Sequence, residues 1–287
     1  MKIYISADLE GVNGIVHSSQ TQPGEPGYER AVGLMHKEIA AVVGGLASSG
    51  VTDIFVADAH WDARNLRAEL LPPGVKLISG WQRPFSMVSG VSGHIGSKTL
   101  VDHGFDGIFL LGYHARSGVA CGVLSHTYRA QVYFDVKLNG VSVGETGLNA
   151  ALAGFHGVPV AFISGDDAAC HEARNLIGSL TCVPVKKAIS RYSAVFSPEA
   201  EVLDALKQGA KEAIDKRDYW NLFCPPKPST LTLTMFDPAM ADGAELIPDV
   251  KRVDDRVVEF SHDDFSVLFR VFLAIGVLAA NRKDPHF

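Results

Sequence analysis

The sequence is poor in cysteine, since Cys121, Cys170, Cys182 and Cys224 are the full set in 287 residues. No two of them form a C-x-x-C pair, so a structural zinc knuckle is not expected. A disulfide scaffold is excluded as well, because such scaffolds are short and dense in cysteine. We therefore expect a reduced protein that is stabilised by a buried hydrophobic core.

A membrane-spanning segment and a secretion signal are also missing from the pattern. The longest apolar stretch, VLFRVFLAIGVLAA at 267–280, contains Arg270. It is shorter than the roughly 20 apolar residues that cross a bilayer. The opening residues, MKIYISAD, lack the charged, apolar and small-residue regions of a signal peptide. These features predict a cytoplasmic protein without a membrane partner.

Clustered positive charge is absent too. The chain has 26 Lys and Arg residues against 32 Asp and Glu, a net charge of −6, and its densest basic run is VKKAISRY at 185–192. Binding to a phosphate backbone requires basic clusters, so we expect no nucleic-acid partner. The mean hydropathy of +0.12 is slightly positive. That surplus suits a homo-oligomer, which hides apolar surface between its subunits.

The order of apolar segments predicts an α/β fold. Strand-like runs cover residues 2–8, 52–58, 75–80, 107–114 and 158–166. Helical spacing follows at 28–50, 146–155 and 167–179. Continuous apolar strands between amphipathic helices indicate a mostly parallel central sheet that is covered by helices on both faces.

Two further segments complete the predicted organisation. Asn139-Gly140 lies between alternating runs and predicts a β-hairpin, because a type I′ turn needs positive φ at both positions. CPPKP at 224–228 is typical of a linker, and beyond it come strand-like runs and a helix over about 264–281. We therefore expect an α/β metal-binding catalytic domain over 1–223 and a small α+β domain over 224–287.

Acidic and histidine residues recur where the predicted strands end. These are Asp8 and Glu10 after the first strand, His60 after the second, His114 after the strand at 107–114, and Glu145 after the hairpin. In an open parallel sheet, ligands bind beyond the carboxyl ends of the strands. Residues two apart in an extended segment point the same way, so Asp8 and Glu10 are expected to reach one cluster.

Three carboxylates and two imidazoles form a ligand set for zinc or manganese. Their charge of about −3 is close to balancing two divalent ions, and the surplus can hold a hydroxide. Each residue also has an ordinary structural interpretation. A lone histidine after a strand is often only a satisfied polar group, Asp8 could cap a helix, and Asp58 could orient His60. The strand-end pattern alone leaves both interpretations open.

Other motifs do not carry chemistry in this sequence. HEARN at 171–175 begins like a zinc motif but has Asn175 where the second histidine is required, so we interpret it as a surface helix. SGDDAAC at 164–170 is typical of a helix cap. Gly-rich phosphate loops and the G-x-S-x-G nucleophile motif are absent from the sequence.

Several short motifs, in order and at matching spacing, resemble the M55 metallopeptidases, which are D-aminopeptidases of the DppA type. The motifs are ADLEGVNGI, YERA, VADAH, GYHAR, VGETG and VKKAISR, and they fall within residues 1–200. The resemblance implies two Zn²⁺ ions per subunit, held by Asp8, Glu10, His60, His114 and Glu145, with Asp8 as the bridging ligand. It also implies a catalytic histidine at His126, in GVLSH.

The same resemblance implies a substrate and an assembly. The substrate would be a short peptide or amino-acid amide with an N-terminal D-amino acid, and the assembly a homo-oligomer in the form of a ring-like homodecamer. Two segments differ from the family pattern, one between SMVSGVSG and FDGIF and one around SGVACGV at 117–123. The second lies between His114 and His126, so we expect the substrate pocket to differ in shape.

Three other interpretations remain open at this point. A two-metal phosphoesterase would use the same ligands, although the sequence has no run of Arg or Lys beside them. A metal-dependent binding protein without turnover would have no use for an additional histidine such as His126. A purely structural interpretation makes all five residues surface polar groups, and metal analysis would separate it from the others.

Overall fold

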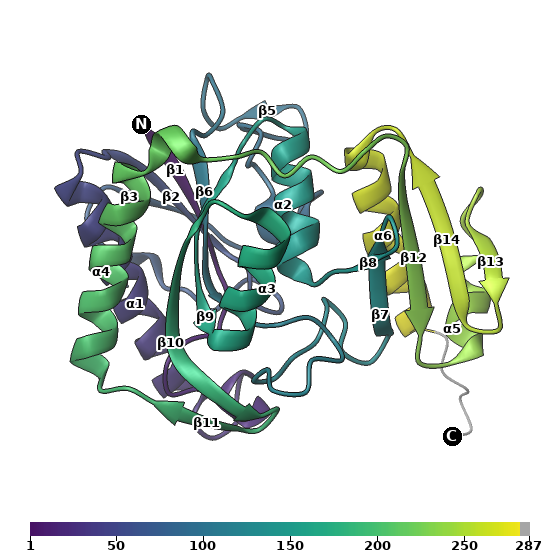
Figure 1. Cartoon of the computed structure of the whole chain (residues 1–287), viewed down its shortest axis with the longest axis horizontal. Helices are drawn as coiled ribbons and strands as arrows, with labels where there is room; N and C mark the ends of the chain where they lie inside the picture. The colour runs from purple at the N-terminus through teal and green to yellow at the C-terminus, as the bar shows by residue number, and fades with distance from the viewer. Residues whose placement is uncertain (282–287) are drawn as a thin grey trace.

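The computed structural model describes residues 1–281 and is built around a seven-stranded sheet (Figure 1). In spatial order the strands are β11 (Ser193–Phe196), β10 (Thr181–Ser190), β9 (Val160–Asp166), β6 (Gly107–Tyr113), β1 (Lys2–Ala7), β2 (Asp53–Asp58) and β3 (Val75–Ile78). All neighbouring pairs are parallel except β10 and β11. The mostly parallel sheet predicted from the sequence is confirmed.

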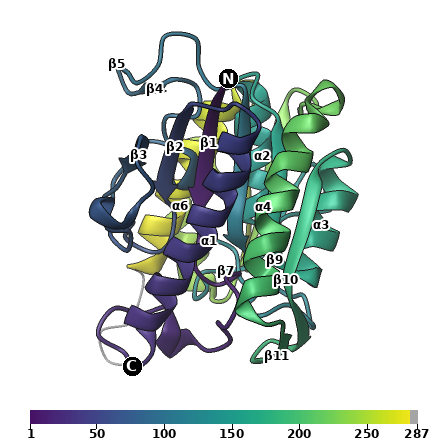
Figure 2. The same ribbon diagram turned by 90° about the vertical axis from the view of Figure 1, so that its left-hand side faces the viewer.

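Helices cover both faces of this sheet. Helices α1 (Tyr28–Ser48) and α4 (Glu199–Asp215) lie side by side on one face, as Figure 2 shows. Helices α2 (Glu145–Phe155) and α3 (Asp167–Ile177) cover the other. Strand β1 therefore has buried side chains on both sides: Ile3 and Ile5 belong to one core cluster and Tyr4 to the other. This two-sided burial explains why the strands are continuously apolar.

A smaller antiparallel sheet of five strands forms the second part of the molecule. Its order is β13 (Lys251–Asp254), β14 (Val257–His262), β12 (Ser229–Met235), β7 (Tyr133–Leu138) and β8 (Val141–Ser142). Helix α5 (Pro238–Ala244) packs on it, and α6 (Phe265–Ala280) contacts both this sheet and α2 (Figure 1). A hairpin of two short strands, β4 (His94–Ile95) and β5 (Lys98–Thr99), forms a third, minor sheet.

The smaller sheet is assembled from two distant parts of the sequence. The hairpin β7–β8 precedes residue 224, yet β7 pairs with β12, so Leu138 lies opposite Leu231. Asn139 and Gly140 have φ of 50° and 82°, as the predicted hairpin turn requires. We propose that residue 224 marks the start of the last segment of the smaller unit, to which the hairpin also contributes.

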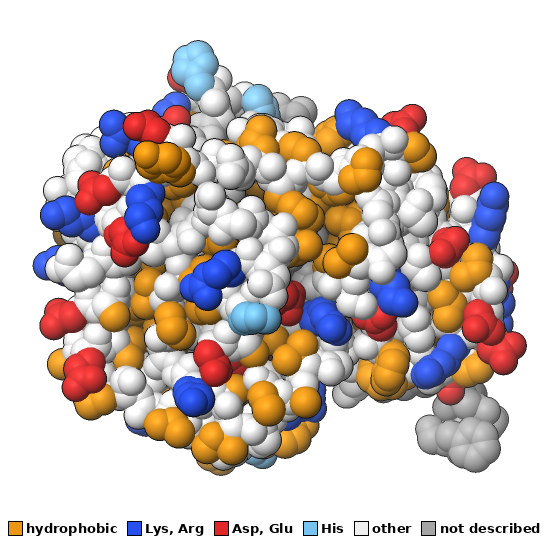
Figure 3. All heavy atoms as spheres, viewed as in Figure 1, with side chains coloured by type: hydrophobic (Ala, Val, Ile, Leu, Met, Phe, Trp, Pro, Cys, Tyr) orange, Lys and Arg blue, Asp and Glu red, His pale blue; other side chains and the backbone are white. Residues whose placement is uncertain are grey.

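Most elements lie where the sequence predicts them, including the long helix α6. No helix among residues 1–281 has the length and apolar character needed to span a membrane. Charged side chains of both signs are scattered over the face seen in Figure 3, and Lys and Arg do not gather into one patch there.

Candidate metal and active site

All five predicted ligand residues meet at one edge of the large sheet. Asp8 and Glu10 follow β1, His60 follows β2, His114 follows β6, and Glu145 opens helix α2. Each is at most 7% exposed. Parallel strands deliver their carboxyl ends to the same edge, and this is why residues so distant in sequence become neighbours.

Asp8 lies between two histidines. Its Oδ1 is 3.1 Å from Nδ1 of His60, and its Oδ2 is 3.5 Å from Nε2 of His114. Glu10 Oε2 lies 2.9 Å from His60 Nδ1, and Glu145 Oε2 lies 3.3 Å from His114 Nε2. Within the described residues, two sets have ligand atoms within 4.8 Å of one another, namely Asp8, Glu10 and His114, and His114, His126 and Glu145.

The predicted reason for the two-residue spacing of Asp8 and Glu10 is wrong. Strand β1 ends at Ala7, and the backbone turns directly afterwards, with Val12 N donating to Leu9 O at 3.2 Å. The two carboxylates therefore converge on His60 because of a turn and not because of an extended segment. Alternation along a strand ceases to apply once the strand has ended.

Backbone carbonyls orient all three histidines. The second ring nitrogen of His60 lies 2.7 Å from Thr21 O, that of His114 lies 3.0 Å from Ala115 O, and that of His126 lies 2.9 Å from Leu124 O. A nitrogen that donates to a carbonyl leaves the opposite nitrogen with a lone pair when the ring is neutral. In each ring that opposite nitrogen faces a carboxylate.

Electrostatics show that the metal-free cluster binds protons tightly. Burial alone lowers the pKa of His60 and His114, but the adjacent carboxylates outweigh it, and both pKa values lie well above the usual range. Burial and repulsion from Glu10 raise the pKa of Asp8 to about 7. Protonated imidazoles thus supply the positive charge that three buried carboxylates require.

The donor set fits a divalent cation. Within the described residues, His114 Nε2 is buried and makes no hydrogen bond, and buried Glu10 Oε2 has no possible partner besides His60 Nδ1 at 2.9 Å. Buried polar atoms are normally satisfied, so an unpartnered nitrogen beside this carboxylate indicates a missing partner. Carboxylate oxygens and imidazole nitrogens are also the ligand atoms that zinc prefers when no thiolate is present. Asp8, Glu10, His60, His114 and Glu145 could therefore hold it.

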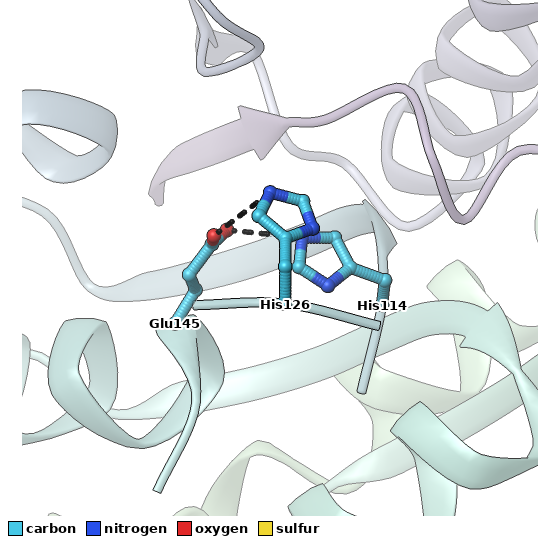
Figure 4. Close-up of side chains that lie close together, drawn as sticks. All are labelled: His114, His126 and Glu145. Carbon is cyan, nitrogen blue, oxygen red and sulfur yellow. Dashed lines mark ion pairs between the residues drawn. The ribbon is translucent and has the colours of Figure 1, made fainter. Parts of the chain in front are cut away.

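His126 adds a third imidazole beside this cluster. It comes from the loop before β7, stacks on His114 with ring centroids 4.1 Å apart, and has its Nε2 3.7 Å from Glu145 Oε1 (Figure 4). Burial and the adjacent His114 lower the pKa of His126, which favours the neutral form of this ring. Leu124 and Tyr128, two residues to either side, have φ of 51° and 57°. Strained backbone of this kind is common where a loop holds a functional side chain.

A pair of glycines brings β1 and β6 into close contact at the site. Gly11 N donates to Gly112 O at 2.8 Å, and Asp8 N donates to Leu111 O at 2.8 Å. A Cβ atom on Gly11 would lie 2.0 Å from the backbone oxygen of Tyr113, and one on Gly112 would lie 2.3 Å from that of Asp8. Only glycine permits this approach, and so the loops that carry Asp8 and His114 are tied together.

Two supporting residues, Lys186 and Glu172, were missed or misjudged from the sequence. Lys186, on β10, is buried and donates to the carbonyls of Glu10, Val12 and Ile15 at 2.6, 2.9 and 2.7 Å. In the sequence Lys186 lies in the basic run VKKAISRY, and nothing there indicates that its side chain is buried. Glu172, in HEARN, accepts from the backbone N–H groups of Arg116 and Gly144, which lie two residues after His114 and one before Glu145.

The sequence suggested that Asp58 could orient the His60 ring, but the structure gives Asp58 another role. Its carboxylate instead accepts hydrogen bonds from the backbone N–H groups of Asn65 and Leu66, at 2.6 and 2.7 Å. The side chain of Asn65 in turn donates to the backbone carbonyl of His60 at 2.7 Å. Asp58 therefore holds the loop that carries His60, while Thr21 orients the ring.

Glu38 of α1 also supports the loop that follows Glu10. Its Oε1 accepts from Asn13 N at 2.8 Å, while its buried Oε2 makes no hydrogen bond. Burial raises the pKa of this carboxyl to about 7, against the opposing effects of the Asn13 hydrogen bond and Lys186. A carboxyl with a raised pKa stabilises the folded state at low pH, and this contribution is lost as pH rises through about 7.

We expect Glu38→Gln to raise the free energy of unfolding above pH 8 by up to about 3 kcal/mol, because glutamine stays neutral when buried. Below about pH 4.5 the variant and the wild type should be equally stable. The difference in their free energies of unfolding should then grow as the pH rises toward 7 and above. Urea unfolding at several pH values measures it. Glu212→Gln, on the exposed side of α4, is the control. A pH-independent difference would contradict the raised pKa.

Most of the cluster lines a pocket of about 720 Å³. Asp8, Glu10, His60, His126 and Glu145 line it, and Trp61 and Trp81, which are 59% and 49% exposed, flank it. Residues of α6 form another part of its wall. A pocket of this size admits a small molecule or a peptide of a few residues.

Comparison with known proteins identifies the family of this chain. The family model described as Peptidase_M55, D-aminopeptidase, matches residues 1–274. A D-aminopeptidase of Bacillus subtilis (strain 168) is 33% identical over 283 residues, which is 97% of this chain and 98% of that protein. The solved structure of the Zn-dependent D-aminopeptidase DppA from Bacillus subtilis, a self-compartmentalizing protease, matches with a TM-score of 0.92 and 32% identity. That match covers 99% of this chain and 100% of the other. The chain belongs to the M55 peptidase family of D-aminopeptidases.

Proposed function

We propose that this protein is a zinc aminopeptidase that binds two zinc ions through Asp8, Glu10, His60, His114 and Glu145. It would hydrolyse short peptides or amino-acid amides with an N-terminal D-amino acid. The observation that carries the metal site is the arrangement of imidazole lone pairs and buried carboxylates around one space. Family membership supports the reaction, and the relatives support the preference for D-amino acids.

When bound, the zinc ions would polarise the scissile carbonyl and activate a water molecule for attack. His126 supplies the proton transfer in this proposal. Its Nδ1 is held by Leu124 O, and its neutral Nε2 can accept a proton from the attacking water and donate it to the leaving amine. The substrate ammonium group would bind beside the carboxylates of Asp8 and Glu10, which line the pocket.

Removal of the metal is expected to abolish hydrolysis. The zinc-loaded protein should cleave D-amino-acid p-nitroanilides faster than the L-forms, and dialysis against a chelator should remove both the metal and the activity. Stoichiometric Zn²⁺ should restore both. The measurements are bound metal by elemental analysis and initial rates on the paired substrates. Activity that survives complete metal removal would contradict the proposal.

Two other functions are tested by the same preparation. A phosphoesterase was disfavoured because no basic run adjoins the ligands in sequence, but the fold does bring Arg83, Arg129 and Arg270 to the pocket. Turnover of p-nitrophenyl phosphate without turnover of the anilides would favour that function. Zinc binding without turnover of either substrate would favour a binding protein. For the assembly, we propose a homo-oligomer in the form of a homodecamer, by analogy with the self-compartmentalizing relative.

A further inference from the structure

The pocket is acidic at one end, and Arg83, Arg129 and Arg270 lie elsewhere in its wall. Arg83 already donates to the backbone carbonyls of Ile78 and Asp58, which leaves Arg129 and Arg270. Arg129 comes from the loop before β7 and is half-buried, and Arg270 lies on α6. Among residues 1–281, the arginines that form ion pairs are Arg64, Arg67, Arg217 and Arg252. The guanidinium groups of Arg129 and Arg270 are therefore not neutralised by an acidic side chain of that part of the chain.

Helix α6 is shaped to present and support these arginines. Arg270, Leu273, Ala274 and Val277 all line the pocket, and their spacing of three and four residues places them on one face of the helix. Gly276 makes room for Arg129, because a Cβ atom there would lie 3.2 Å from Arg129 Cδ and 3.4 Å from its Nε. The Arg129 side chain is thus packed against the helix.

Tyr133 fixes the same region. Its hydroxyl donates to Phe272 O at 2.8 Å, and a Cβ atom on Gly276 would lie 2.8 Å from that hydroxyl. The loop that begins at His126 and carries Arg129 therefore ends at a residue that is tied to α6, the first residue of β7. Arg129 is three residues from the proposed catalytic histidine, and one short loop places both in the pocket.

We propose that Arg129, assisted by Arg270, binds the free C-terminal carboxylate of a short peptide substrate. This inference rests on the proposed peptidase function. A guanidinium group offers two parallel N–H donors to a carboxylate, which makes it selective for that group. A short peptide is a zwitterion, and its carboxylate end matches the two arginines, while its ammonium end would lie toward the metal ligands. The enzyme would thus favour peptides of a few residues over longer or C-terminally blocked ones.

The test compares D-alanyl-glycine with D-alanyl-glycinamide, which differ only in the terminal carboxylate. Zinc-loaded wild type should favour the free acid in kcat/KM. In Arg129→Gln this preference should fall by about tenfold, and in the double variant with Arg270→Gln by about a hundredfold, mainly through KM. Arg129→Lys should retain part of the preference. Arg217→Gln, whose side chain lies outside the pocket, is the matched control.

The possible outcomes are distinct. Equal kcat/KM of wild type for the two substrates would overturn the proposal, and so would an equal loss on both in Arg129→Gln with an unchanged ratio. Thermal melting of each variant shows whether a loss comes from misfolding, and the Arg270→Gln ratio then decides independently. Hydrolysis of neither substrate by zinc-loaded wild type would contradict the peptidase function itself, and with it this use of the arginines.

Discussion

Asp8→Ala should leave the protein without either zinc ion and lower kcat/KM by at least about a thousandfold. Among the five proposed ligands, Asp8 is the carboxylate that contacts both histidines, with Oδ1 toward His60 and Oδ2 toward His114. Its removal takes a negative charge and a ligand atom from both halves of the cluster. Glu10→Ala removes a side chain whose ion pair, within the described residues, is with His60, so that variant should keep one zinc ion.

Elemental analysis after dialysis, together with initial rates, measures this effect. Asp204→Ala on the exposed side of α4 is the control for surface charge. The melting temperatures of the metal-free variant and the metal-free wild type show whether the variant misfolds. Burial and repulsion from Glu10 raise the pKa of Asp8 in the absence of metal, so its ionised form does not stabilise the metal-free fold. Metal-free Asp8→Ala should therefore melt no lower than metal-free wild type. Two bound zinc ions in Asp8→Ala would contradict the bridging role.

His126→Ala should lower kcat by about 10²- to 10⁴-fold while the protein keeps its zinc. The ring is held by Leu124 O, lies over His114, and has a lowered pKa, so its free nitrogen is available for proton transfer. Removal of a proton-transfer group raises the barrier of the chemical step. It should change KM much less, because the ligands that bind the substrate carbonyl and ammonium remain.

Metal content decides between this role and a simpler one. The ring lies close enough to His114 and Glu145 to be a further metal ligand. Steady-state kinetics and bound zinc must therefore be measured on the same His126→Ala sample, with His94→Ala, at an exposed position of β4, as the control. Loss of one zinc ion along with the activity would make His126 a ligand. Full activity would rule out either role.

The parts of the site that follow from strand ends could be predicted from the sequence. Asp8, His60 and His114 each come directly after or within two residues of an apolar strand, and a parallel sheet brings such positions together. Glu145 was found in the same way, from the hairpin signal at Asn139-Gly140. Local patterns of two kinds, strand ends and a turn, were therefore enough to assemble the cluster.

Residues that act across the fold could not be found in that way. Lys186 holds the Glu10 loop from a strand that is 176 residues away, and Glu172 is in a helix whose motif indicates only an exposed surface. Arg129 and Arg270 meet one pocket because α6 packs beside the loop after His126. The pairing of β7 with β12 could not be predicted from the sequence for the same reason, since it depends on tertiary contacts between distant segments.

The pairing of β7 with β12 limits how the chain can be truncated and how far the smaller sheet can change its orientation. The hairpin β7–β8 begins seven residues after His126 and ends three residues before Glu145. A chain shortened at residue 223 would keep all five candidate ligands, yet it would expose the β7 edge that β12 now covers and would lack the α6 wall. Conversely, a change in the orientation of the smaller sheet would displace His126 and Glu145, because short segments of chain connect these residues to β7 and β8. The smaller unit is thus mechanically inseparable from the site and cannot be treated as an accessory module in engineering.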